Sequence, residues 1–145
     1  MAAMSMAKAL GLTDLQLDIM RVLWTAGEAS IADVHGALKA RRLAHPTVAT
    51  LLSRLEKKGA IAHTTEGRQF IYRPVLKQAE VRKSMMARVR TVLYAEDVPA
   101  LISQLLSDRD ITREELDHVK ALIEAKEKEL AALGRARTSR KSKER

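Results

Sequence analysis

The 145-residue sequence predicts a mainly α-helical protein with one small β-hairpin, followed by a second region made of helices alone. Three observations support this fold class. Apolar residues recur at helical spacing over most of the chain, two short β-prone runs flank Gly67, and every pattern after Pro74 is helical. We therefore expect one domain over residues 10–75, a helical domain over residues 76–133, and a basic, disordered tail over residues 134–145.

Composition excludes several functional classes. The four aromatic residues are too few for the base-stacking surface of a single-strand-binding protein. The longest stretch without a charged residue covers residues 43–53, whereas a membrane-spanning helix needs about 20 apolar residues. No secretory signal is visible at the start, so we expect a cytoplasmic protein without a membrane contact. Because the sequence has no cysteine, disulfides and thiolate metal sites are also excluded.

The formal net charge of +8 points to a polyanionic partner, but this charge is unevenly distributed. Residues 1–74 carry +4, residues 75–133 carry −1 and residues 134–145 carry +5. This pattern predicts an anion-binding domain joined to a region that contacts another protein.

The first two helices are indicated by their caps. Thr13 and Gln16 have the spacing of a capping box, and Gly27 is placed to end the helix that they begin. Trp24 lies beside the apolar stripe of this helix, so we assign its ring to the core. Ser30, a favourable N-cap residue, then begins a second, short helix.

The third helix follows after a turn of about three residues, which is the spacing of a helix-turn-helix. Pro46 opens it, and Lys57, Lys58 and Gly59 close it. Its exposed stripe has small hydroxyl side chains first and cations later, which suits approach to base edges followed by phosphate neutralisation. An ordinary solvated helix face would show the same pattern, so this helix alone leaves both interpretations open. The stripe consists of Thr47, Thr50, Ser53, Arg54 and Lys57.

The hairpin favours the first interpretation. Residues 61–64 and 69–73 are β-prone runs around a turn that contains Gly67, and three helices followed by a hairpin predict a winged helix. Arg68 at the hairpin tip is expected to meet a phosphate on the same side as Arg54, although a tip arginine can also be only a solubilising charge.

The helices after residue 75 have broad apolar faces in fewer than 60 residues, which is a poor basis for an independent core. We therefore expect a homodimer, rather than a three-helix cap folded back onto the same chain. The predicted dimer interface consists of Met85, Val89, Val92, Leu101, Leu105, Leu116, Val119, Ile123 and Leu130.

Three segments together resemble the penicillinase-repressor family, the BlaI/MecI/CopY regulators: residues 12–24, residues 47–59, and the wing that ends at Tyr72-Arg73-Pro74. The resemblance covers about residues 10–130. It implies a dimeric bacterial transcriptional repressor that binds a palindromic, double-stranded operator through its third helix and wing.

Single positions of the third helix follow the family in part. Thr47, Thr50 and Arg54 match the family's recognition-helix positions. Pro46 and Ala49 stand where the antibiotic-resistance repressors carry a base-reading or phosphate-reading cation. The resemblance therefore implies the same helix and groove but leaves the operator sequence open, because alanine can pack on a thymine methyl but cannot bind guanine bidentately.

The family also suggests two kinds of regulation. Repressors of the antibiotic-resistance branch are cut by a sensor protease, and the equivalent bond here is Gln104–Leu105. Leu105 also belongs to the predicted dimer stripe, and we favour that packing role. Copper-responsive members use C-terminal cysteines, which this sequence lacks, and its four histidines have no ligand spacing. We therefore expect no metal, no cofactor and, without a catalytic arrangement, no enzymatic activity.

Two other functions compete with the repressor. First, a winged helix can serve as a protein–protein interaction module. Second, the protein can bind DNA non-specifically, mainly through the basic tail over residues 134–145.

Overall fold

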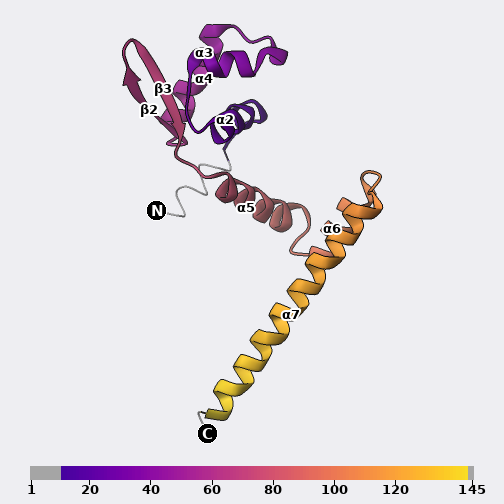
Figure 1. Ribbon diagram of the computed structural model, residues 1–145. Helices are drawn as coiled ribbons and strands as arrows, with labels where there is room; N and C mark the ends of the chain where they lie inside the picture. Colours follow the sequence, from indigo (N-terminus) through magenta and orange to yellow (C-terminus); the bar gives the residue numbers. More distant parts are fainter. Residues whose placement is uncertain (1–10, 144–145) are drawn as a thin grey trace. The chain divides into compact units, whose positions relative to one another are not determined.

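The computed structural model describes residues 11–143 and confirms a mainly α-helical fold with a small sheet (Figure 1). The chain divides into two compact units, and the division in the sequence falls between Glu96 and Asp97. The first unit contains α2 (Asp14–Ala26), β1 (Ala29–Ser30), α3 (Ile31–Ala37), the 3₁₀ turn η1 (Lys39–Arg41), α4 (His45–Lys57), β2 (Ile61–Glu66), β3 (Gln69–Pro74), α5 (Gln78–Arg88) and the π-helical turn η2 (Val89–Leu93). The second unit contains α6 (Val98–Ser107) and α7 (Arg113–Lys143).

The predicted caps of the first two helices are confirmed. The Thr13 N–H donates to Gln16 Oε1 at 3.0 Å, and the Gln16 N–H donates back to Thr13 Oγ1 at 3.2 Å. Ser30 and Asp33 form the same reciprocal pair at the start of α3, at 3.0 and 3.1 Å. Gly27 ends α2 with a φ of 84°, a conformation that glycine adopts without steric cost.

The sheet has three strands in the order β1-β3-β2, all antiparallel. β2 and β3 form the predicted hairpin, and Glu66 pairs with Gln69 across a two-residue turn in which Gly67 has a φ of 62°. We call this hairpin, residues 61–74, the wing. β1 was not predicted, because a strand of two residues is too short to show an alternating pattern.

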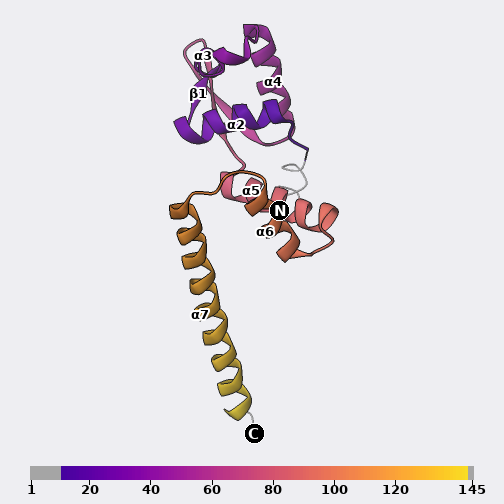
Figure 2. The same ribbon diagram turned by 90° about the vertical axis from the view of Figure 1, so that its right-hand side faces the viewer.

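The first core is shared by α2, α3, α4 and the sheet, and Figure 2 shows these helices packed around one another with β1 beside α3. Ile19, Leu23, Val48, Leu52 and Leu55 are among the fully buried side chains at its centre.

The expected domain boundary at residue 75 differs from the structure, in which α5 belongs to the first unit. Leu76 and Val81 are 3% exposed and belong to the same core as α2. Trp24, which we assigned to the core, packs against it and donates its Nε1–H to the Leu76 carbonyl at 2.8 Å. α5 ends at Arg88, and the backbone then changes to the π-helical turn that begins at Val89.

In the second unit, both helices are capped at their N-termini, and the tail differs from the expectation. Asp97 caps α6 by accepting from the Ala100 N–H at 3.1 Å, and Thr112 forms a capping box with Glu115 at the start of α7. α7 continues to Lys143, so residues 134–143 are helical and not disordered. Alanine, arginine and lysine favour helix, and cations near the C-terminus interact favourably with the helix dipole. Between residues 11 and 143, no helix is both long and apolar enough to cross a membrane.

Candidate nucleic-acid interface

α4 separates an apolar face from a polar face. Val48, Leu52 and Leu55 are fully buried, which fixes the helix on the core. The opposite face is open: Ala49 is half-buried, and the other residues predicted for the interface are exposed. These exposed residues are Pro46, Thr47, Thr50, Ser53, Arg54 and Lys57. The helix itself begins at His45, one residue earlier than expected, with proline in its second position.

The two adjacent lysines at the end of α4 have different roles. Lys58 Nζ donates to the Gly11 carbonyl at 2.7 Å and to Gln16 Oε1 at 3.1 Å, so this lysine ties α4 to the start of α2. Within residues 11–143, Lys57 and Arg54 form neither an ion pair nor a side-chain hydrogen bond. Their charges are therefore available to an external anion.

Thr50 directs its hydroxyl proton into its own helix. Oγ1 donates to the Pro46 carbonyl at 3.0 Å, which leaves the lone pairs of Oγ1 and the methyl group for an external contact. In a DNA groove this side chain can accept from a base amino group or pack on a thymine methyl.

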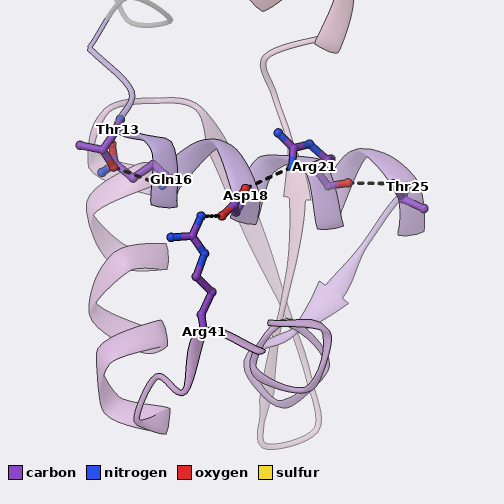
Figure 3. Close-up of polar contacts among 6 residues, drawn as sticks. All are labelled: Thr13, Gln16, Asp18, Arg21, Thr25 and Arg41. Carbon is purple, nitrogen blue, oxygen red and sulfur yellow. Dashed lines mark hydrogen bonds and ion pairs between the residues drawn. The ribbon is translucent and has the colours of Figure 1, made fainter. Parts of the chain in front are cut away.

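The turn before α4 is held by polar contacts to both preceding helices. Asp18 on α2 accepts from Arg21 at 3.1 Å and from Arg41 in η1, and Figure 3 shows Asp18 between these two guanidinium groups. His35 on α3 uses Nε2 to bond the Leu43 carbonyl at 2.9 Å. Because a carbonyl only accepts, Nε2 carries a proton in this contact. These contacts fix where α4 begins.

The wing is fastened to the second half of α4. His63 on β2 donates from Nδ1 to Glu56 Oε2 at 2.5 Å, and Phe70 stacks on the imidazole with ring centroids 4.1 Å apart. Tyr72 is buried beside them. Burial raises the pKa of the Tyr72 phenol, and the negative charge of Glu56 raises it further.

The wing tip forms a groove with the start of α4. This groove has a volume of about 370 Å³ and is lined by Ser30, Ile31, Ala32, His45, Arg68, Gln69 and Phe70. Arg68 was predicted, and it lines this groove together with His45. His45 and Gln69 were missed. Only their positions in the sequence could have indicated them: His45 precedes the proline that opens the helix, and Gln69 follows the hairpin turn.

The residues predicted for the dimer interface lie in both units. Met85 is on α5, where it lines a groove of about 280 Å³ together with Trp24 and Val81. Val89 and Val92 lie in η2. On α6 and α7, none of the side chains is fully buried. Leu101, Leu116 and Val119 are half-buried in the second unit, and Leu105, Ile123 and Leu130 are exposed.

An open groove of about 460 Å³ lies along α6 and α7, and it is lined mainly by leucine, isoleucine and valine side chains. The predicted cleavage residues Gln104 and Leu105 lie inside α6, where both are exposed. Within residues 11–143, no three histidine or carboxylate side chains are grouped as metal ligands.

The winged helix and the exposed polar face of its α4 define the class of protein, a winged-helix DNA-binding repressor. The chain belongs to the penicillinase repressor family, because the model of that family matches residues 12–125. This finding confirms the family predicted from the sequence. Members of the family are transcriptional repressors and not enzymes.

Similar proteins agree with this assignment. The penicillinase repressor of Bacillus licheniformis is 26% identical over 114 residues, which cover 78% of this chain and 89% of that protein. The transcriptional regulator BlaI of Mycobacterium tuberculosis is 39% identical over 94 residues, which cover 63% of this chain and 67% of that protein. The crystal structure of the YusO protein from Bacillus subtilis shares the fold, with a TM-score of 0.50 and 22% identity over 86% of this chain and 79% of that one.

Proposed function

We propose that this chain is a sequence-specific repressor that binds a palindromic DNA operator as a homodimer. α4 enters the major groove, and the wing contacts the DNA backbone. The observation that carries the proposal is the exposed face of α4, on which hydroxyl groups near the start precede cations without a partner in residues 11–143. This is the order in which a major-groove helix meets base edges and then phosphates.

The residues at the start of α4 define what the operator can present. Ala49 and the methyl groups of Thr47 and Thr50 can pack on thymine methyls. Pro46 and Ala49 offer no hydrogen-bond donor to guanine, so guanine is not read at these two positions. Arg54, together with Lys57 and Arg68, supplies phosphate contacts that position the helix.

The proposed homodimer is supported by the second unit. α6 and α7 leave large apolar side chains exposed, among them Ile102, Leu105, Leu122, Ile123 and Leu130. A second copy that covers them would remove this surface from water. A two-fold symmetric dimer requires two half-sites about one helical turn apart, or slightly more.

A sensor protease that cuts Gln104–Leu105 is a possible route to derepression within this proposal. The bond lies inside a helix, and a protease generally needs an unfolded segment. The exposed Leu105 side chain fits the dimer role better, and we propose that role for it. Co-expression of the repressor with a membrane protease encoded next to it tests the alternative.

The basic end of α7 supports a second candidate function, non-specific DNA binding. Arg135, Arg137, Arg140, Lys141 and Lys143 lie on its last turns without an acidic residue among them. Under the main proposal, deletion of residues 134–145 weakens binding by a similar factor for every sequence and leaves the site preference unchanged. Loss of all binding on deletion would favour the second candidate.

A gel shift with the DNA upstream of the protein's own gene, at two salt concentrations, tests the proposed function. Thr50→Ala and Arg54→Ala should each cost about 1 to 3 kcal/mol of binding free energy. Arg54→Ala should also reduce the salt dependence by about one phosphate contact for each bound copy. Arg88→Ala, which removes an exposed cation from α5, is the matched control. Equal binding to any sequence, or no binding at all as expected of a protein–protein interaction module, would contradict the proposal.

A further inference from the structure

We propose that the groove between the wing tip and the start of α4 binds a DNA backbone phosphate through both His45 and Arg68, so that DNA affinity depends on the protonation of His45. The inference rests on the proposed function and deepens it. It adds a titratable residue to the DNA contact and predicts a pH dependence that the α4 face does not explain.

The groove has the shape and the charge for one phosphate. Its walls come from the start of α3, the first residue of α4 and the wing tip, and its volume is about 370 Å³. Among its lining residues, only His45 and Arg68 can carry a positive charge. Both are exposed, and within residues 11–143 neither has an ion pair or a hydrogen bond through its side chain.

The His45 side chain has an aromatic neighbour that is itself held in place. Its ring lies beside that of His35, with centroids 5.5 Å apart, and His35 is itself held by the Leu43 carbonyl. His45 is also the first residue of α4, so it moves with the helix that enters the major groove. Arg68 reaches the same groove from the wing. A phosphate between the two would join the helix and the wing to one DNA strand.

Within residues 11–143, no carboxylate forms an ion pair with His45 or Arg68. The Asp33 carboxylate on α3 accepts the Ser30 N–H at 3.0 Å, and this hydrogen bond is the main reason why the pKa of Asp33 is lowered. The Nε2 of His35 faces a carbonyl. A phosphate in the groove would attract the Arg68 guanidinium and a charged imidazole at His45 alike.

The direction of the pH effect follows from linkage. Because a phosphate favours the charged imidazole, the complex binds a proton more tightly than the free protein does, and lower pH must then strengthen DNA binding. Histidine changes charge between about pH 5 and pH 8, so the effect should lie in that range. One added phosphate contact changes affinity by about fivefold near 0.15 M salt, since each contact adds a slope of about −0.9.

The test measures dissociation constants of the full chain by fluorescence anisotropy between about pH 5.5 and pH 8.5 at constant salt. Two duplexes are compared: the sequence footprinted upstream of the gene, and a scrambled sequence of the same length. We expect the wild-type affinity for both duplexes to rise toward low pH by about fivefold for each bound copy of the chain, because phosphate contacts carry no sequence information. The variant His45→Gln should lose most of this rise, and its salt slope at low pH should fall by about one unit for each bound copy.

Two further variants sharpen the result. His45→Lys keeps a positive charge across the range and should bind at high pH as the wild type binds at low pH. His118→Gln, which removes an exposed histidine from α7, is the matched control and should keep the wild-type pH profile. Thermal unfolding of each variant confirms that it is folded.

The outcomes separate this inference from the proposed function. An unchanged pH profile in His45→Gln would overturn the phosphate site, even if operator preference persists. A His45 effect confined to the footprinted duplex would also overturn it, because it would indicate base reading. If the pH effect is present on both duplexes without any preference between them, the phosphate site stands and sequence-specific repression fails.

Discussion

Glu56 Oε2 on α4 lies 2.5 Å from His63 Nδ1 on β2, so the helix that we propose for the major groove is bonded directly to the wing. Phe70 on β3 stacks on the same imidazole, which ties both strands of the wing to this contact. The two elements that we propose to contact DNA are therefore bonded to each other near the end of α4.

The first prediction concerns this pair. His63→Ala should lower the free energy of unfolding by up to about 1 kcal/mol, since both side chains are partly exposed and such pairs contribute little on their own. The loss of DNA affinity should be larger than for a neutral surface change, because the wing is no longer fixed to α4. Urea unfolding and anisotropy measure the two effects. Thr65→Ala, on an exposed position of β2, is the control, and equal losses in both variants would contradict the role of the pair.

The second prediction is an alkaline loss of stability that depends on Tyr72. Burial raises the pKa of this phenol, so the folded protein keeps a proton that the unfolded chain releases above about pH 10. The free energy of unfolding should therefore fall as the pH rises above that value, and it should fall less steeply in Tyr72→Phe. Unfolding curves at several alkaline pH values test this, with Tyr94→Phe as the control. The same slope in both variants would show that Tyr72 is not responsible.

The third prediction concerns the link between α2 and α5. Trp24→Phe removes the donor that bonds the Leu76 carbonyl, and it should cost about 1 to 2 kcal/mol because a largely buried acceptor loses its partner. Hydrogen exchange should then increase in α5 more than in α3. If exchange instead increases evenly over the first unit, the bond does not specifically hold α5.

The fourth prediction concerns the dimer. A glutamate placed in the apolar surface of the second unit, as in Ile123→Glu, should convert the proposed dimer into a monomer, because the interface would bury an unpaired charge. Light scattering at micromolar concentration gives the mass. Ser103→Glu adds the same charge at an exposed polar position of α6 and should remain dimeric. A wild-type chain that is already monomeric would end the dimer proposal.

What could be predicted from the sequence was mostly local. The caps at Thr13 and Ser30 depend on residues three positions apart in the sequence, and both caps are present. The hairpin was also visible, because its strands are adjacent and its turn contains Gly67.

Features that depend on distant pairs were missed. β1 exists because Ala29 and Ser30 pair with Tyr72 and Ile71. α5 joins the first unit through the bond from Trp24 to Leu76 and through the burial of Val81. The groove lined by His45 and Arg68 also depends on residues distant in the sequence, and no sequence pattern indicates that these two lie close together. The tail was misjudged for another reason: its charge suggested disorder, whereas its arginine, lysine and alanine residues favour helix.

The most direct test of the account is a hydroxyl-radical footprint of the full chain on the DNA upstream of its own gene, repeated with Arg54→Ala. The account predicts two equivalent protected segments, related by two-fold symmetry and about one helical turn apart or slightly more. Both segments should weaken together in the variant, because each copy of α4 makes the same contact. Protection without symmetry, or a footprint that Arg54→Ala leaves unchanged, would contradict the claim that paired copies of α4 read the operator.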